Sequence, residues 1–499
     1  MLRSGVKRWL SLGALVTPGK SRFPLFVNMA CAMIGLAVGI HGLSAEGGDE
    51  AKTDQGGAEA IEHPLVNGER ADIWVFAGQS NSQGWSLFKA PVNADPRVLY
   101  LFEPGWPAVG QPVPKDQHAH WVKAEEPINK MFSSWTPPPV ELNILLQRTG
   151  VAAPEGFNVQ DFLRAKNQDK VPLGGVGPGV FFANHLLSSI DTPIGLVYCG
   201  VGGSPIFTWD ASRKAQGGGG NYFNMLKSID RVGGHIKGIV YLQGETDAMA
   251  PGQWQDYEEA LLRLIDAVRE DTGKPDLPFI YGQIGCFVHP YGVMDNAWEK
   301  VRAAQQRVAG LRKNAYLVGT LDLPLEDCVH LSFEGYQRLG ARLAEIALSK
   351  VYHQPGHGNP ISPGKIELLQ PENTRKLIRI HFDGVTGKLR ALGRPTGFEL
   401  RPRIPLQNPD HYHTRQKEWK APIYVVYRVD FDPEDPAGLI LGVFDNAQLL
   451  GKPHKLNEPV DLVYGPGTNP YVNIVDDKDI PIPGFGPLEV PLTPVPPKQ

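Results

Sequence analysis

Cysteine is scarce in this sequence. Only four cysteines occur in 499 residues, and Cys31 lies in an N-terminal apolar segment. The other three, Cys199, Cys286 and Cys328, exclude a complete intrachain disulfide framework because their number is odd. One bridge beside a free thiol and three free thiols both fit this count.

An excess of either charge sign is also missing. The chain has 49 Lys and Arg against 53 Asp and Glu, which gives a formal net charge of −4. Proteins that bind nucleic acid or anionic membranes normally carry a basic surplus, so we expect neither partner. The pairs His118/His120 and His411/His413 lack the further ligands of a zinc site, so we expect no metal.

Long apolar runs are limited to one segment near the N-terminus. Basic residues precede a 12-residue apolar stretch over 29–40, and the small-residue sequence Leu43-Ser44-Ala45 follows it. This order is typical of a secretory signal, and the stretch is shorter than the roughly 20 residues of a membrane-spanning helix. We predict a signal peptide over 1–45 and a secreted or periplasmic protein. Membrane attachment is expected only if this segment stays uncleaved.

Short apolar runs alternate with helical patterns over 71–354. The runs cover 72–77, 97–102, 193–199, 236–242, 278–283 and 315–319, and the helical patterns cover 179–190, 254–269, 296–311 and 332–351. Runs that are apolar throughout are typical of strands buried on both faces. The alternation therefore predicts an α/β domain with a parallel sheet covered by helices on both sides.

Three other regions break this pattern. The polar, Gly-rich residues 46–70 are expected to form a linker, and the Pro- and Trp-rich residues 105–172 an insertion that covers part of the site. From 366 to 490 strand patterns are separated by turn residues, which predicts a smaller all-β domain after a hinge at 355–364.

Polar residues directly after three of the predicted strands are the candidates for chemistry, because ligands of open α/β sheets bind beyond the carboxyl ends of the strands. Gly78 permits a sharp turn that presents the Ser80 hydroxyl. Gln243 has amide donors that could face a developing negative charge. In the same loop Thr246 or Asp247 could instead cap a helix.

The third candidate segment lies just before the last helix. Asp327 precedes His330 by three residues, so its carboxylate can accept the imidazole proton and leave the other ring nitrogen to act as a base. Ser332 is expected to cap the helix that follows. Each of these segments alone is also compatible with ordinary turns and caps.

Six segments together resemble one family. They are Phe76-Ala-Gly-Gln-Ser-Asn81, Gly175-Val-Gly-Pro-Gly179, Ile194-Gly-Leu-Val-Tyr-Cys-Gly-Val-Gly-Gly203, Gln243-Gly-Glu-Thr-Asp247, Val301-Arg-Ala-Ala-Gln305 and Asp327-Cys-Val-His-Leu331. Their order within 72–350 resembles SGNH-type (GDSL-like) hydrolases, in the branch of the sialate O-acetylesterases and the acetyl xylan esterases of carbohydrate esterase family six. The resemblance implies a three-layer, flavodoxin-like α/β/α domain. Residues 366–490 resemble the β-domain that follows in the sialate esterase branch.

The resemblance also implies catalytic roles. Ser80 would be the nucleophile, His330 the general base and then the general acid, and Asp327 the group that orients His330. The oxyanion donors would be the Ser80 N–H, an N–H of Gly202-Gly203 and the Gln243 amide. The wider group has Asn at the last position, whereas this branch carries Gln.

Further residues have secondary roles in this scheme. Glu245 is the alternative to Asp327 as the orienting acid, and Gln79, Asn81 and Trp209 are expected to contact substrate. Trp106, Trp121 and Trp135 are further candidates for stacking on sugar rings. No metal or organic cofactor is required by this chemistry.

The function expected from the sequence is a secreted serine esterase that removes O-acetyl groups from carbohydrate, either an acetylated polysaccharide or sialic acid. Two alternatives stay open. One is a hydrolase that acts on non-sugar esters such as lipids. The other is a non-catalytic glycan-binding protein that retains the fold.

Overall fold

The structure is a computed structural model that describes residues 61–86, 92–103, 119–126, 128, 175–212, 220–249, 253–288, 295–369, 376–403, 424–445 and 459–495. The predicted signal peptide lies outside these residues, as do most of the expected insertion and Trp106, Trp135, His118, His411 and His413. These expectations, and the predicted domain boundaries, stay predictions.

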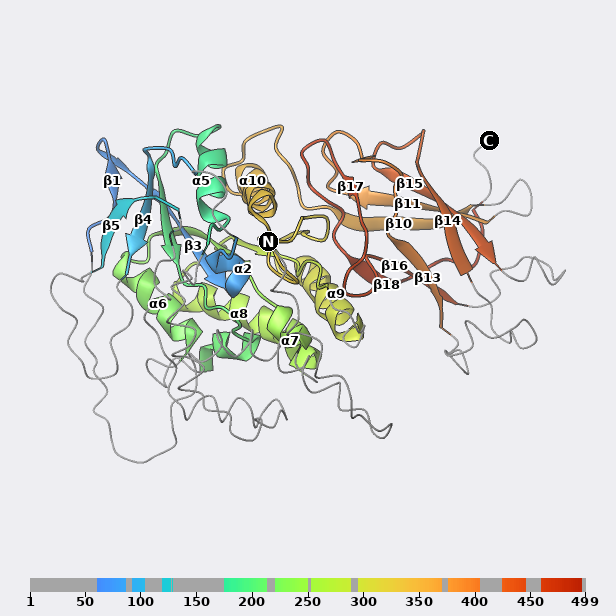
Figure 1. The fold of residues 1–499 in the computed structure, drawn as a ribbon, viewed down its shortest axis with the longest axis horizontal. Coiled ribbons are helices and arrows are strands. Elements are labelled where there is room, and N and C mark those ends of the chain that lie inside the picture. The colour runs from blue at the N-terminus through green and yellow to red at the C-terminus, as the bar shows by residue number, and fades with distance from the viewer. Residues whose placement is uncertain are drawn as a thin grey trace, which may run out of the picture.

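A seven-stranded sheet forms the centre of the first part of the chain (Figure 1). Its order is β5-β4-β6-β3-β7-β8-β9. The bounds are β3 (Asp72–Gly78), β4 (Val98–Phe102), β5 (His120–Lys123), β6 (Ile194–Tyr198), β7 (Ile236–Leu242), β8 (Phe279–Gly282) and β9 (Ala315–Val318). All neighbouring strands are parallel except β5, which pairs antiparallel with β4 at the edge. The sequence did not predict β5, because this four-residue edge strand lacks the buried apolar run of the others.

Helices cover both faces of this sheet, as the α/β/α prediction requires. They are α2 (Ser80–Gln83), α5 (Gly179–Leu187), α6 (Asn221–Arg231), α7 (Glu245–Met249), α8 (Tyr257–Asp271), α9 (Asp295–Leu311) and α10 (Phe333–Lys350), with short 3-10 turns η3 (Ile206–Trp209) and η5 (Gln253–Asp256). Helices α5 and α10 pack on the face that buries Trp74 and Phe76 of β3. Helices α6, α8 and α9 pack on the face that buries Ile73 and Val75. Successive side chains of β3 point to opposite faces of the sheet, so this strand contributes to two cores.

The second part of the chain is built from antiparallel strands, as predicted. One sheet has the order β10-β11-β15-β14, a second β13-β16-β18, and β12 pairs with β17. The bounds are β10 (Ser362–Leu369), β11 (Lys376–Asp383), β12 (Arg390–Ala391), β13 (Phe398–Pro402), β14 (Tyr424–Phe431), β15 (Gly438–Asp445), β16 (Val460–Tyr464), β17 (Ile474–Val475) and β18 (Phe485–Glu489).

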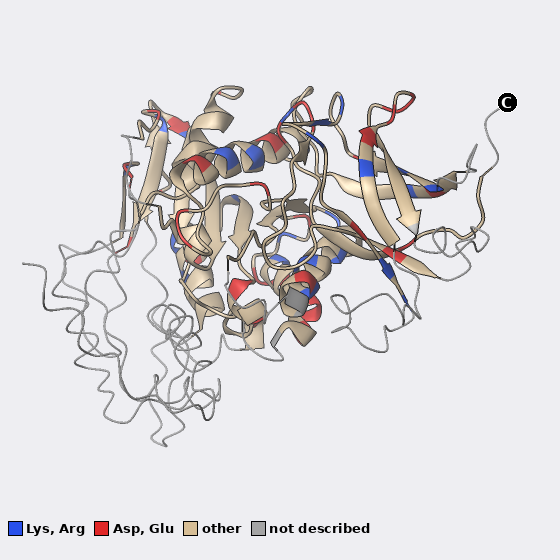
Figure 2. Ribbon diagram, turned by 45° about the vertical axis from the view of Figure 1, so that its right-hand side comes forward, with Lys and Arg blue, Asp and Glu red and all other residues tan. Residues whose placement is uncertain are grey.

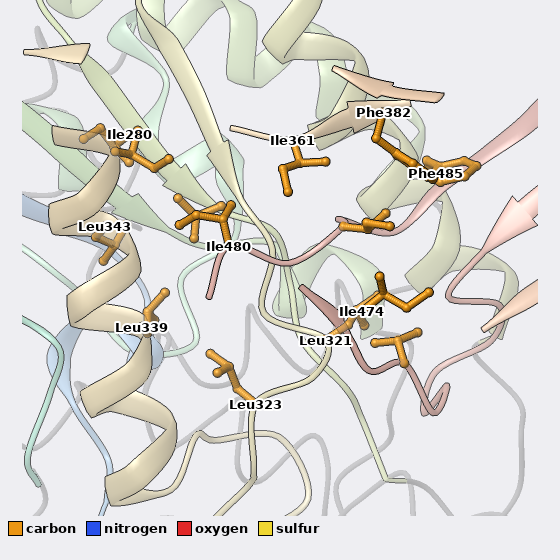
Figure 3. Close-up of a cluster of buried hydrophobic side chains, with 14 of the residues drawn as sticks. Ile280, Leu321, Leu323, Leu339, Leu343, Ile361, Phe382, Ile474, Ile480 and Phe485 are labelled. Carbon is orange, nitrogen blue, oxygen red and sulfur yellow. The ribbon is translucent and has the colours of Figure 1, made fainter. Parts of the chain in front are cut away.

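One apolar core runs across both parts (Figure 3). Leu339 and Leu343 of α10 belong to the same buried cluster as Phe382 of β11 and Phe485 of β18. Burial of apolar surface is the main favourable term in folding, so this shared cluster ties the β-strands to the helix that follows the catalytic candidates.

A buried ion pair reinforces the same junction. The Arg342 guanidinium is 1% exposed and donates to both carboxylate oxygens of Asp322 at 2.8 and 2.6 Å. Its Nε also donates to the backbone carbonyl of Asp479, in the β-rich part of the chain, at 2.6 Å. Helix α10, the loop after β9 and the β-rich part therefore meet at one guanidinium.

We expect Arg342→Ala to lower the free energy of unfolding by about 3 kcal/mol, because the buried Asp322 carboxylate then keeps only its ion pair with the partly exposed Arg338, at 2.9 Å. Urea unfolding followed by circular dichroism measures this loss. Arg312→Ala is the control, since Arg312 pairs with Asp266 at 2.7 Å on the surface and should cost less than about 1 kcal/mol. Equal losses in the two variants would contradict the role of Arg342.

A small hairpin lies inside the residues expected to form a linker. Strands β1 (Leu65–Val66) and β2 (Glu69–Arg70) pair antiparallel around Asn67 and Gly68, whose φ angles are +52° and +86°. Positive φ at both positions is the geometry that Asn-Gly favours in two-residue hairpins. This local signal is stronger than the polar composition on which the linker was inferred.

The described residues carry charges of both signs and three cysteines. Figure 2 shows basic and acidic positions interspersed along the ribbon, without a gathering of one sign. Cys199, Cys286 and Cys328 are free thiols, which decides between the two cysteine alternatives. In the described part of the chain, no helix is both long and apolar enough to cross a membrane.

Candidate active site

The sequence-predicted site residues gather at the carboxyl edge of the parallel sheet. Ser80 follows β3, Gly202 and Gly203 follow β6, Gln243 follows β7, and His330 lies in the loop between β9 and α10. Strand β3 is flanked by β6 on one side and β7 on the other. The strands that follow β3 in the chain, up to β6, lie on one side of it, and those from β7 onward lie on the other side, so the strand order reverses at β3. Such a switch point is where open α/β sheets form their binding crevice.

A tight turn presents Ser80 to His330. Gly78 has a φ of +120°, and a Cβ there would lie 2.0 Å from the Leu242 carbonyl oxygen, so only glycine fits. The next residue donates its backbone N–H to the same carbonyl at 2.7 Å, which fixes the start of α2 against β7. The Ser80 Oγ lies 2.9 Å from His330 Nε2, within reach for proton transfer.

Asp327 holds the other side of the imidazole. Its Oδ2 lies 2.6 Å from His330 Nδ1, and its Oδ1 accepts the backbone N–H groups of Val329 and His330 at 2.8 and 2.7 Å. Burial acts to raise the pKa of Asp327, but the hydrogen bonds from His330 and the backbone outweigh it and leave the pKa below its usual value. The carboxylate therefore stays ionised and fixes the Nδ1–H tautomer.

Asn81 joins the serine turn to the histidine loop rather than facing solvent. It is 7% exposed, its Nδ2 donates to Glu245 Oε1 at 2.7 Å, and its Oδ1 accepts the Leu331 N–H at 3.2 Å and the Tyr336 hydroxyl at 2.9 Å. These bonds link α2, α7 and α10. The expected substrate contact by Asn81 is not what this arrangement indicates, because its amide is occupied by protein groups.

Glu245 supports Asn81 and does not contact the imidazole. It is 4% exposed, and its Oε2 has no hydrogen-bond partner among the described residues. Burial raises the pKa of Glu245, against the opposing hydrogen bond from Asn81 and the attraction of His330. A cavity of about 10 Å³, the size of one water, adjoins Glu245 and Asn81. Of the two acids considered, Asp327 is the one that reaches His330.

Gln243 is placed differently from its expected role as an oxyanion donor. It is 1% exposed, and its Nε2 donates to the Ser204 carbonyl at 3.0 Å and to the Asp247 carboxylate. Both amide hydrogens are thus directed at protein acceptors, which differs from the expected orientation toward the oxyanion. The oxyanion role of Gln243 stays a prediction. Sequence position could not distinguish a free amide from one that braces the loop after β6.

The cap of α7 also differs from expectation. Gln79 Oε1 accepts the N–H groups of Gly244 and Thr246, each at 3.4 Å, so a residue of the serine turn caps the helix from a distance. Asp247 instead accepts the Ile206 N–H at 3.0 Å. Gln79 is 3% exposed and its oxygen is engaged here, which gives it a structural place beside Ser80 rather than an open substrate surface. The Ser332 cap of α10 is confirmed, with Oγ accepting the Gly335 N–H at 3.2 Å.

Burial raises the pKa of Asp247 to about 7, against opposing hydrogen bonds from Gln243 and the Ile206 backbone. The folded chain therefore keeps a proton that the unfolded chain releases near pH 4, so this group lowers stability as pH rises from about 4 to about 7. Asp247→Asn carries no such proton. We therefore expect the free energy of unfolding of Asp247→Asn, relative to that of wild type, to rise between about pH 4 and pH 7, as measured by urea unfolding at each pH. Parallel pH profiles of the two proteins would contradict this expectation.

Trp209 does not offer a sugar-stacking surface. Its indole is 0% exposed, its Nε1 donates to Ser204 Oγ at 3.1 Å, and the ring packs edge-on against Tyr241 at 5.6 Å. The expected substrate contact is therefore wrong, because the tryptophan fills the core under the loop after β6. Trp121 lies partly buried in β5, at the sheet edge.

Gly202 and Gly203 lie in the turn that follows β6, next to the serine turn. The Val201 N–H donates to the Gly78 carbonyl at 2.8 Å, which holds this turn beside the end of β3. Gly203 has a φ of +64°, a conformation that favours glycine. The Ser80 N–H is the first amide of α2, so no preceding turn of helix accepts it.

The structure also shows two residues that the sequence analysis missed. Trp85 stacks on the His330 ring, and Tyr336 donates to Asn81 from the first turn of α10. Trp85 lies five residues after Ser80, beyond the segment 76–81 that was singled out, and no local pattern indicates a partner 245 residues away. Within the described residues no group of three or more His, Cys, Asp or Glu side chains could hold a metal ion.

Comparisons with known proteins identify the family. Residues 70–349 match the family model for carbohydrate esterases described as sialic acid-specific acetylesterases. A protein of Arabidopsis thaliana named "Probable carbohydrate esterase" is 36% identical over 183 residues, which cover 35% of this chain and 64% of that protein. The alignment thus spans less than two thirds of this relative.

A solved structure supports the fold. The crystal structure of a carbohydrate acetylesterase from Xanthomonas citri aligns with a TM-score of 0.52 at 18% identity, covering 83% of this chain and 80% of that one. The family model covers more than half of the sequence, including all the strands that carry the candidate site. The chain therefore belongs to the carbohydrate esterase family of the sialic acid-specific acetylesterases.

Proposed function

We propose that this protein is a serine esterase that removes O-acetyl groups from carbohydrate through Ser80, His330 and Asp327. The observation that carries the proposal is the continuous chain of contacts from Ser80 Oγ to His330 Nε2 at 2.9 Å and from His330 Nδ1 to Asp327 at 2.6 Å. Nucleophile, base and orienting acid in hydrogen-bond sequence are the geometry of covalent acyl transfer. Membership of the carbohydrate esterase family supports the substrate class.

In the proposed reaction, neutral His330 removes the Ser80 proton as the serine oxygen attacks the acetyl carbonyl carbon. The Asp327 carboxylate stabilises the imidazolium that forms. The imidazolium then protonates the leaving sugar oxygen, which gives an acetyl-enzyme and a sugar alcohol. Water repeats the attack under base catalysis by His330 and releases acetate.

The negative charge on the carbonyl oxygen needs donors that are already in place. The Ser80 N–H and the backbone N–H groups of Gly202 and Gly203 are the donors we propose, because both turns meet at the end of β3. Loss of one such donor typically costs about 100- to 1000-fold in rate. The Gln243 amide is left out of this set because Ser204 and Asp247 occupy it.

Acetate release from the purified full chain tests the proposal. Acetylated xylans, O-acetylated sialic acids and a small aryl acetate are compared with aryl esters of long acyl chains. Release of acetate from a sugar supports the proposal, whereas preference for long acyl chains favours the lipid alternative. A folded protein that binds acetylated glycans and hydrolyses no acetyl ester would overturn it in favour of a binding protein.

The predicted N-terminal signal extends the proposal to location. We propose that the enzyme acts outside the cytoplasm, where acetylated polysaccharides and exposed sialic acids are encountered. The support is the order of basic, apolar and small residues over 1–45.

A further inference from the structure

Trp85 stacks face to face on the proposed catalytic histidine. The ring centroids of Trp85 and His330 are 4.5 Å apart, and the planes are inclined by only 21°. The imidazole uses its two in-plane nitrogens for Ser80 and Asp327, so the indole covers a ring face that neither of them reaches. His330 is 3% exposed, which leaves this contact largely shielded from water.

The backbone on both sides of Trp85 is held by hydrogen bonds. The residue before it, Gly84, has a φ of +94° and accepts the Gly175 N–H at 3.1 Å. The residue after it, Ser86, accepts the Val176 N–H at 3.1 Å. The Ser86 hydroxyl also donates to Glu326 at 3.2 Å, in the loop that carries His330. These bonds fix the backbone that carries the indole beside the loop of His330.

The chemistry of the reaction gives this stack a consequence. The imidazole is neutral before the serine is deprotonated and cationic afterwards, and the face of an indole attracts cations. The carboxyl groups near the ring are Asp327 on its own loop, Glu245 from α7 and Glu326 beside Ser86. Beside these carboxyl groups, Trp85 is the aromatic side chain that stacks on a face of the imidazole.

We propose that Trp85 is a positioning residue that fixes the plane of His330 and stabilises its imidazolium during acyl transfer. The kinetic part of this inference rests on the proposed function, whereas the stack itself does not. A purely structural tryptophan would fill the same volume without responding to the charge on His330.

Three variants separate these roles. Trp85→Phe keeps an aromatic face and should lower kcat/KM for an acetyl ester less than about 3-fold. Trp85→Leu keeps apolar bulk without that face, and we expect a 5- to 30-fold loss with KM little changed, which corresponds to about 1–2 kcal/mol. Trp85→Ala should lose at least as much. The acid limb of the kcat/KM profile should move to lower pH in Trp85→Leu, because the protonated ring has lost a stabilising partner.

A fluorescence measurement tests the stack without turnover. Protonated imidazole quenches a stacked indole, so the emission difference between wild type and Trp85→Phe should fall when the buffer is acidified. His330→Asn should abolish this dependence. Trp254→Phe is the control, since Trp254 lies in η5 and its removal should leave the pH-dependent component intact.

The outcomes separate the two claims. Full activity of Trp85→Leu with an unshifted acid limb would overturn the inference, as would equal losses in Phe and Leu variants accompanied by a raised KM. Titrating Trp85 emission in a protein that hydrolyses no acetyl ester supports the stack and overturns the proposed function. If Trp85→Leu fails to fold, pH-independent Trp85 emission in the wild type still overturns the inference.

Discussion

Replacing Ser80 with alanine is expected to reduce acetyl ester hydrolysis by at least about 10⁴-fold, because it removes the hydroxyl that contacts His330 Nε2 and would form the acyl intermediate. The Ser80 Oγ is the atom that lies 2.9 Å from the base. Acetate release at saturating substrate measures the loss, and mass spectrometry of the intact protein should detect an acetyl adduct on wild type alone. Folding should be unaffected, since the substitution removes one hydroxyl from a short helix.

Ser82→Ala provides the matched control for this experiment. Ser82 lies on the same short helix, is 0% exposed, and its hydroxyl has no hydrogen-bond partner among the described residues. Its removal should leave activity within about 3-fold of wild type, because no proton path leads through it. Undiminished hydrolysis by Ser80→Ala, or an equal loss in both variants, would exclude Ser80 as the nucleophile.

The second large effect is expected at the orienting acid. Asp327→Asn should lower kcat by up to about 10⁴-fold, the loss seen when a serine protease triad carries the amide in place of its carboxylate. The amide can donate to Nδ1 and so favours the tautomer with a proton on Nε2, which cannot accept the serine proton. Initial rates across pH 5–9 measure the loss.

Glu245→Gln is the comparison that identifies the acid. The Gln oxygen can still accept from Asn81, and burial already raises the pKa of Glu245 toward the neutral form. We therefore expect less than about a 10-fold loss. A larger loss in Glu245→Gln than in Asp327→Asn, with both variants folded by circular dichroism, would transfer the orienting role to Glu245.

Strand and helix positions along the chain could be predicted from the sequence where burial is complete, whereas the order of the strands in the sheet was not predicted. The runs at Ile236–Leu242 and Ala315–Val318 are largely apolar because both of their faces are covered, and this pattern can be recognised in a single sequence. Strand β5 was not predicted, because an edge strand buries less surface and so lacks a continuous apolar run. The β1–β2 hairpin was not predicted, because the polar, Gly-rich composition of 46–70 indicated a linker despite the Asn-Gly turn.

The site divides along a similar line. Ser80, Asp327 and His330 could be selected because each follows a strand and because the motifs resemble one family. Gln243 and Trp209 were assigned too open a position, since sequence alone does not show which polar groups are already satisfied inside the protein. Burial and hydrogen-bond partners depend on residues far away along the chain.

The sequence by itself determined the α/β class and the loops that bear the reactive groups, because these depend on periodicity and on the residues that follow each apolar run. Only the tertiary structure decided that Asp327 rather than Glu245 reaches His330, that Gln243 braces a loop, and that Trp85 covers the imidazole. The contacts of Gln243 with Ser204 and of Trp85 with His330 join segments far apart in the chain, so they follow from the packing of the fold rather than from local sequence.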